Sequence, residues 1–417
     1  MINLLFLLIC ILFSIQTKNA YDYLLEWGKN NSLMISDKLR MKFISENDKR
    51  YYADDDIPKD TLLMSIPQKI MLNLDNALEL LNSKKINKLY TEYKKYSIDI
   101  SLGFLTSTGD QTFLTYLIYL VNHRQKYYKK NKFYQFFHYL FDIFETNLDS
   151  FPIFYKDEQL DLLKGSNALM QLTLMKELYK DEVEKFEKDY NQKEIDFDEY
   201  LRYRSLIITK SLNVSQVSII PFMDLFASDP IDYNVDFGVN YTTGNIDIFT
   251  TKKVRRDDIL YIRSGYFSNI KRFVLYGETF EKLQNYVDNF HVPMVSFKML
   301  KNYHLNEKDF DFENTIDLSR KKFYKYALEA YKKVSLLKKD DGSDLSAYKL
   351  FLKNLKMVRD NYAPITTSDI HKQFVNKKDI DNVRRVLDFE KKFLDDKIKE
   401  LKKVINKMEN SKKNNYL

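Results

Sequence analysis

The chain has 417 residues, of which 44% are hydrophobic, and this is enough for a sizeable core and for more than one domain. Its 66 basic and 59 acidic side chains give a net charge of +7, and the two signs are mixed along the chain. This mixture and the lack of an RNA- or DNA-binding motif argue against a nucleic-acid partner. The 9 glycines form no phosphate-binding loop and no nucleophile elbow, and we attribute their scarcity to compositional bias.

The first element is an apolar run from Leu4 to Ile15. It is too short to span a bilayer comfortably and has the length of a signal-peptide core. We therefore expect residues 1–20 to be a signal peptide, cleaved between about Thr17 and Ala20, and the mature protein to follow the secretory pathway without a membrane span. A buried N-terminal helix is the alternative.

Cysteine and histidine usage limits the chemistry of the chain. The single cysteine, Cys10, lies inside the apolar run, so the mature chain would have no disulfide, no zinc thiolate and no cysteine nucleophile. The 5 histidines show no metal-ligand spacing. The run from Asp54 to Asp56 is either a cation site or an exposed turn, and the turn is favoured. No metal is predicted.

The remaining elements follow in the order β, helices, β, helices. Residues 21–104 contain short extended pieces, such as the apolar run from Thr61 to Ile66 that ends at Pro67. Residues 105–210 show helical periodicity, with Phe113, Leu117 and Leu120 on one face. Residues 211–284 return to β-like runs, and residues 285–417 are again helical. The pattern predicts an α+β fold with a helical insert, followed by an all-α C-terminal domain.

The last helix is long and amphipathic. Its apolar residues recur at spacings of three and four, with charges between them: Ile380, Val383, Leu387, Leu394, Leu401, Ile405 and Met408. We interpret it as a helix packed on its own domain, and a short coiled coil is the alternative.

The most specific stretch runs from Phe151 to Ser166 (FPIFYKDEQLDLLKGS). It resembles a segment in the helical insert of SET-domain proteins of the Rubisco lysine methyltransferase class. Further matches keep the family's order from about residue 21 to 400: Tyr23–Trp27, Ala53–Pro67, Ile219–Phe226, Ser268–Asn269, Leu275–Gly277 and Asn382–Leu394. The resemblance implies a SET domain, a C-terminal substrate-binding domain of the Rubisco-LSMT type, and a family activity of S-adenosylmethionine-dependent protein-lysine methylation.

The same resemblance locates the cofactor contacts, and most are replaced. Asp48, Lys49 and Arg50 stand where active relatives have a Gly-Arg-Gly run that lies against S-adenosylmethionine, so we expect crowding of the cofactor and backbone strain. Asp60 replaces the glycine of the following turn. Ala227 and Ser228 stand where relatives have an Asn-His pair, and Lys210 stands where they have Arg.

The resemblance places Ser264, before Gly265, at the family's catalytic tyrosine, whose hydroxyl orients the substrate nitrogen. Serine carries its hydroxyl on a shorter arm. Tyr266 is a substitute only if the register shifts. Three separate parts of one site are therefore changed while the framework motifs remain.

These replacements leave three hypotheses. The leading one is a catalytically degenerate SET protein, without a cofactor, that binds a protein partner through its C-terminal helical domain. The second is an active but divergent protein-lysine methyltransferase that uses S-adenosylmethionine. The third is a structural coiled-coil partner acting through residues 380–408.

Overall fold

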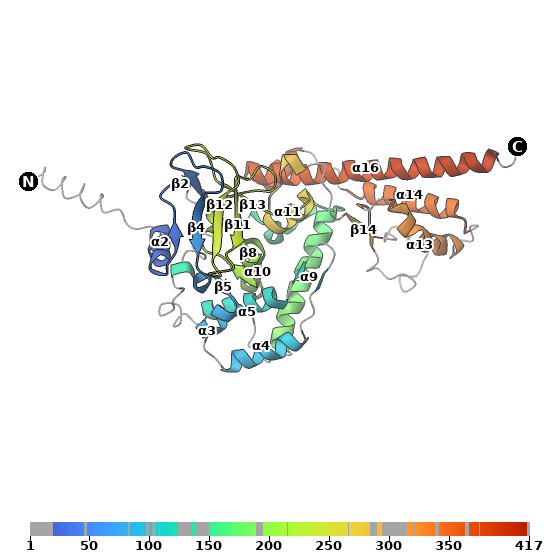
Figure 1. Cartoon of the computed structure of the whole chain (residues 1–417). Helices are drawn as coiled ribbons and strands as arrows, with labels where there is room; N and C mark the ends of the chain where they lie inside the picture. Colours follow the sequence, from blue (N-terminus) through green and yellow to red (C-terminus); the bar gives the residue numbers. More distant parts are fainter. Residues whose placement is uncertain are drawn as a thin grey trace, which may run out of the picture. The chain divides into compact units, whose positions relative to one another are not determined.

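The structure is a computed structural model of the chain (Figure 1). It describes residues 20–45, 48–81, 84–96, 100–101, 106–107, 109–123, 133, 135–137, 140, 150–188, 195–214, 216–265, 267–283, 290–293, 315–319, 322–337, 342–362, 367–374 and 376–414. Contacts divide the chain into two compact units. The sheet unit comprises Met1–Asp99, Ser107–Leu148 and Glu187–Tyr266, and the helical unit comprises Ile100–Thr106, Asp149–Phe186 and Phe267–Leu417. The expected signal peptide lies outside the described residues, except for Ala20.

The core of the sheet unit is a 6-stranded sheet whose strand order, β1-β4-β12-β11-β13-β10, does not follow the chain. The strands β4, β12 and β11 are antiparallel neighbours, whereas β13 runs parallel to both β11 and β10. In β12 buried residues alternate with half-buried ones, as expected for a strand with one face on the core. The strands are β1 (Met34–Ile35), β4 (Leu62–Ile66), β10 (Ala227–Asp229), β11 (Val235–Val239), β12 (Ile246–Thr250) and β13 (Tyr261–Arg263).

A separate antiparallel ribbon, formed by β2 (Leu39–Ser45) and β3 (Asp48–Ala53), pairs Met41 with Tyr51 and Lys42 with Arg50. Because successive residues of a strand point to opposite faces, Tyr51 and Ala53 share one face, and both are buried (1% and 0% exposed). Arg50 lies on the other, half-exposed face. Three further short strands form a sheet in the order β5-β9-β8: β5 (Leu72–Asn73), β8 (Ser211–Asn213) and β9 (Val217–Ile219).

Helices complete the sheet unit, and two of them, α5 (Gly109–His123) and α10 (Phe197–Lys210), lie in the segment 105–210 where periodicity predicts helices. In α5 Phe113 and Leu117 are fully buried, and Leu120 is half-buried. The helix α10 is capped by the residue before it, Asp196, whose carboxylate accepts the N–H of Glu199 at 3.0 Å. The other helices of this unit are α2 (Ala20–Asn30), α3 (Leu74–Leu81), α4 (Lys84–Tyr96), η1 (Gln68–Ile70) and η4 (Met223–Leu225). The short strands β6 (Ile100–Ser101) and β7 (Thr106–Ser107) pair with each other where the chain passes between the two units.

The helical unit is built around α16 (Lys377–Asn414), which contacts α11, α14 and α15. Figure 1 shows α14 beside α16. Six of the seven apolar residues of α16 predicted to face the core are buried within this unit, with Val383, Leu394 and Leu401 fully buried, and Met408 is half-buried. This confirms a helix packed on its own domain and leaves its apolar face unavailable for a coiled coil with another chain. The unit also contains η3 (Pro152–Phe154), α8 (Asp157–Asp161), α9 (Asn167–Lys188), α11 (Asn269–Tyr276), η5 (Glu281–Leu283), β14 (His291–Pro293), β15 (Thr315–Asp317), α13 (Tyr324–Leu337), α14 (Asp344–Asp360) and α15 (Thr367–Gln373).

The most specific sequence stretch ends where α9 begins, and its last residues have structural roles. Gly165 has φ of +83°, and a Cβ there would lie 2.5 Å from the carbonyl oxygen of Asn361, so no other residue fits without a shift. Ser166 accepts the N–H of Leu169 at 3.0 Å. Glu390 of α16 accepts the N–H groups of Asn167 and Ala168 at 2.7 and 3.0 Å, so it caps α9 from a distant part of the chain.

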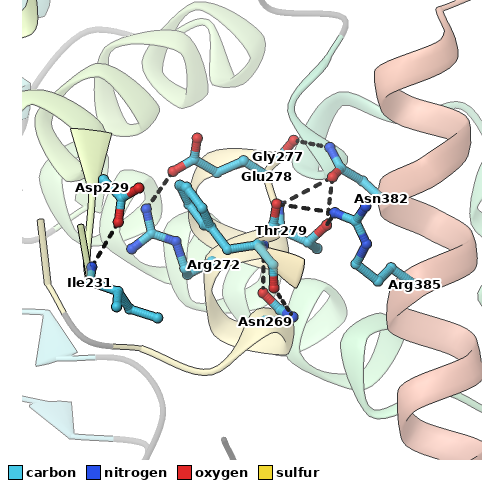
Figure 2. Close-up of polar contacts among 10 residues, drawn as sticks. Asp229, Ile231, Asn269, Arg272, Gly277, Glu278, Thr279, Asn382 and Arg385 are labelled. Carbon is cyan, nitrogen blue, oxygen red and sulfur yellow. Dashed lines mark hydrogen bonds and ion pairs between the residues drawn. The ribbon is translucent and has the colours of Figure 1, made fainter. Parts of the chain in front are cut away.

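A second framework motif joins α11 to α16 (Figure 2). The Asn382 side chain donates to the carbonyl of Gly277 at 2.8 Å and accepts the N–H and the hydroxyl of Thr279 at 3.1 and 2.7 Å. Arg272, only 2% exposed, is neutralised by Glu278 at 2.6 Å and lies over the ring of Phe280. Hydrogen bonds therefore connect the two motifs, one resembling the end of a SET domain and the other the last helix of the family.

Candidate functional site

The expected cofactor and catalytic positions all lie in the sheet unit, and one strand segment connects them. The N–H of Leu260 donates to the carbonyl of Tyr51 in β3 at 3.1 Å, and the carbonyl of Leu260 accepts the N–H of Ala227 in β10 at 3.0 Å. The rings of Tyr51 and Phe226 also meet, with centroids 4.9 Å apart. The segments that hold Arg50 and Ala227 are thus brought to either side of residues 258–261.

The first expected element, from Asp48 to Arg50, forms the start of β3 and is therefore extended. The backbone strain expected at the two glycine positions is absent at Arg50, because an extended strand accepts any side chain there. The Arg50 side chain points away from the buried face that Tyr51 occupies. The side chains of Asp48 and Lys49 lie outside the described residues. Asp60, by contrast, has a left-handed backbone conformation with φ of 61°. This is the turn position at which the sequence comparison has aspartate in place of the family's glycine.

The second element, Ala227 and Ser228, forms most of β10 beside β13. Ala227 is half-buried and pairs with Tyr261, while Ser228 is exposed and pairs with Ile262. Alanine offers no side-chain donor or acceptor, so this position cannot make the hydrogen bonds of an asparagine.

Lys210 ends α10, and its ammonium nitrogen lies 3.7 Å from the carboxylate of Asp224. Asp224 belongs to η4, which follows Phe222 in the left-handed region (φ 70°) and leads into β10. The ion pair therefore connects the end of α10 to the turn that precedes Ala227. A compact ammonium makes this contact with a single nitrogen, whereas arginine offers a fork of donors.

Ser264 follows β13, is half-buried, and donates its N–H to the carbonyl of Asp229 at 3.5 Å. The carboxylate of Asp229 accepts the N–H of Ile231 at 2.7 Å (Figure 2). It also accepts the N–H of Asp232 at 2.7 Å. The position expected for the catalytic hydroxyl therefore lies beside the strand of Ala227 and Ser228. Tyr266, the alternative hydroxyl, lies outside the described residues.

Two features of this region carry no recognisable sequence motif. Asn234 fixes the start of β13, because its side chain donates to the carbonyl of Ile259 at 2.9 Å and accepts the N–H of Tyr261 at 2.7 Å. The hydroxyls of Tyr21 and Tyr51 meet at 3.0 Å, and burial raises the pKa of Tyr21. Period-two alternation in β3 indicates that Tyr51 faces inward, but nothing in the sequence points to Tyr21 as its partner.

The acidic run at Asp54 is an ion-paired turn. Asp54 lies 3.4 Å from Arg40, and Asp56 lies 2.9 Å from Lys253 and accepts the N–H of Arg256. Hydrogen bonding to Lys253 lowers the pKa of Asp56. Within the described part of the chain, no three His, Cys, Asp or Glu side chains gather where they could hold a metal ion. In the same part, no helix is both long and apolar enough to cross a membrane.

Comparison with known proteins identifies the fold. No protein-family model and no curated protein matches the sequence. Among solved structures, that of Rubisco LSMT bound to AdoMet superimposes with a TM-score of 0.64 at 13% identity, covering 93% of this chain and 92% of that chain. Rubisco LSMT bound to sinefungin and monomethyllysine gives 0.62 at 14% identity, with coverage of 93% and 92%. The SET domain of LSMT bound to lysine and AdoHcy gives 0.61 at 13% identity, with coverage of 92% and 91%.

The chain therefore has the SET-domain fold of the Rubisco LSMT structures over nearly its whole length. The predicted α+β class and the C-terminal helical region are confirmed.

Proposed function

We propose that this protein is a catalytically degenerate SET-fold protein that binds a protein partner through its helical unit. The observation that carries the proposal is Ala227 on β10, because the side chain of an alanine cannot hydrogen-bond a cofactor. Ser228 on β10 and Ser264, which follows β13, add only short hydroxyls. The framework motifs, by contrast, keep the contacts that hold the helical unit together.

The alternative function is an active, divergent protein-lysine methyltransferase. Two observations favour it. The structures with the same fold were solved with AdoMet, AdoHcy or sinefungin, two of them with lysine or monomethyllysine as well. In addition, Arg50 lies in an extended strand, where a side chain causes no backbone strain.

Titration of the purified protein with S-adenosylmethionine by calorimetry separates the two functions. We expect no heat of binding at ligand concentrations up to about 1 mM, which corresponds to a binding free energy weaker than about −4 kcal/mol. The matched comparison is the variant D48G/R50G/A227N/S228H, which restores the family residue at four of the replaced positions and should bind more tightly. Micromolar binding by the unmodified protein, or methyl transfer to a lysine-containing protein, would overturn the degenerate function.

We further propose that the protein enters the secretory pathway, on the strength of the apolar run from Leu4 to Ile15. The test is to fuse residues 1–20 to a reporter enzyme in eukaryotic cells and to sequence the N-terminus of the product. Reporter in the medium, cleaved between about residues 17 and 20, supports the proposal. Reporter that stays in the cytosol with Met1 in place contradicts it.

A further inference from the structure

The net positive charge of the protein is concentrated in two neighbouring helical segments. Residues 344–360, which form α14, hold four basic and two acidic side chains. Residues 391–414, the second part of α16, hold nine basic and four acidic side chains. Together they carry a net +7, which equals the net charge of the whole chain, so the remaining residues balance to zero.

The two segments lie side by side in the helical unit, in antiparallel directions. Arg359 near the end of α14 binds Asp395 with two contacts of 3.1 and 3.3 Å, and Lys349 near its start lies 2.7 Å from Glu409. These pairs set the register, in which Lys356 comes level with the turn of α16 that holds Lys399 and Lys402. Figure 1 shows the two helices adjacent.

Exposed lysines cover the solvent side of this helix pair. We define the lysine face as the exposed side chains of Lys353, Lys356, Lys399, Lys402, Lys403 and Lys407. The acids beside them already have basic neighbours: besides Asp395 and Glu409, Asp396 lies 3.7 Å from Lys399, and Glu400 lies 3.2 Å from Lys397. The lysine face therefore keeps an excess of positive charge after these pairings.

The chemistry of the lysine face fits an acidic protein segment better than a nucleic acid. Arginine is the residue that best matches phosphate, because its fork of donors binds two oxygens at once. The arginine beside this face, Arg359, is already bound to the carboxylate of Asp395. Base stacking needs exposed aromatic rings, and the exposed large hydrophobic side chains of the described residues all lie outside α14 and α16.

Insertion into a lipid surface needs an exposed apolar stripe beside the lysines. In α16 the apolar stripe is buried within the helical unit, and the described residues of α14 and α16 expose no large hydrophobic side chain.

We propose that the lysine face of α14 and α16 is the docking surface for an acidic segment of a protein partner. This inference rests on the proposed binding function and names the surface and the partner's chemistry. From Lys399 to Lys407 the helix rises about 12 Å, so the face matches a short acidic stretch rather than a whole domain. Opposite charges across such a surface set the association rate and the choice of partner.

The test measures fluorescence anisotropy of a labelled ten-residue oligo-glutamate peptide with the full-length protein. We expect binding that weakens as salt is added. The variant K356E/K402E/K403E should lose about tenfold or more in affinity. The control K29E/K69E/K252E reverses three exposed lysines of the sheet unit and should lose less than about threefold. Thermal unfolding of both variants checks that each remains folded.

Equal losses in the two variants would overturn the proposal, because net charge alone would then account for binding. The proposal would also be overturned if duplex DNA or phosphatidylserine vesicles bound more tightly than the peptide and the K356E/K402E/K403E variant lost that binding. The lysine face would then bind another polyanion. These outcomes are independent of the titration with S-adenosylmethionine, so failure of the lysine face and failure of the degenerate function can be told apart.

Discussion

Two aspartates in turns, Asp60 and Asp257, have left-handed backbone conformations with φ of 61° and 67°. A non-glycine residue in this region costs roughly 1–2 kcal/mol, somewhat less for aspartate, whose short polar side chain can bond locally. The two turns differ in what the side chain does. The carboxylate of Asp60 forms an ion pair with its exposed neighbour Lys59 at 3.7 Å, whereas that of Asp257 binds Arg40 and also contacts Lys42 at 3.4 Å.

We expect Asp60→Gly to stabilise the protein by about 0.5–1 kcal/mol, because glycine removes the strain of the left-handed conformation and no strong contact is lost. Asp257→Gly is the matched control. It relieves the same strain but removes the partner of Arg40, which holds the pKa of Asp257 below its usual range, so we expect no gain. Urea unfolding of the two variants measures the difference, and equal stabilisation in both would show that the ion pair contributes nothing.

These residues also show what single positions could be predicted from sequence. The sequence predicts a glycine-type turn at Asp60, and the positive φ of Asp60 agrees with this. Such a turn can be recognised because it lies between two strands. The backbone strain expected at Arg50 is absent, because the motif does not reveal that this position lies in an extended strand paired with β2. The roles of Asn234 and Tyr21 could not be predicted, since their partners lie 27 and 30 residues away.

At the scale of elements, the N-terminus of α9 depends on one buried carboxylate of α16. Glu390 is fully buried, and it accepts the hydroxyl of Tyr362 at 2.6 Å in addition to the two backbone N–H groups of α9. Burial raises the pKa of Glu390 to about 7, and the three donors act against this rise. The ionised group is thus held by good hydrogen bonds but at a high desolvation cost.

The sign of the resulting pH dependence follows from the raised pKa. An unfolded glutamate titrates near pH ~4.3, so between about 4.5 and 7 the folded state keeps a proton that the unfolded state has lost. We expect the stability that Glu390 contributes to be greatest below this window and to fall as the pH rises through it. Asp379, whose pKa burial also raises, acts in the same direction. Urea midpoints measured from pH 5 to 8 should therefore decrease.

The variant E390Q isolates this contribution. At pH 5 the protonated carboxyl of Glu390 can still accept a backbone N–H through its hydroxyl oxygen, which the amide nitrogen of glutamine cannot do, so we expect a loss of about 1–3 kcal/mol at this pH. Its stability should also change less with pH than that of the unmodified protein. The exposed Glu158→Gln serves as the control and should keep the original profile. An E390Q protein with an unchanged pH profile would show that Glu390 does not titrate in this range.

At the scale of the whole molecule, compact units and sequence segments do not coincide. Helical periodicity predicts a separate domain from residue 285 onward, and the helices of that segment are present. The helical unit, however, also takes in Asp149–Phe186 and the segment from Phe267. Periodicity predicts which face of a helix is buried, but not which element packs against that face. It therefore cannot predict that Glu390 caps α9 or that Asn382 contacts Gly277.

We therefore expect a fragment of residues 285–417 to lack a cooperative fold. Removed from α9, Glu390 would keep only Tyr362 as a partner within this fragment, and Asn382 would lose Gly277 and Thr279. Each buried polar group left without its partners costs about 1–3 kcal/mol, a large share of the 5–15 kcal/mol that stabilises a typical domain. Thermal unfolding followed by near-ultraviolet circular dichroism tests this, with the full-length protein as the control. A sharp transition in the fragment would show that the C-terminal helices form an independent domain after all.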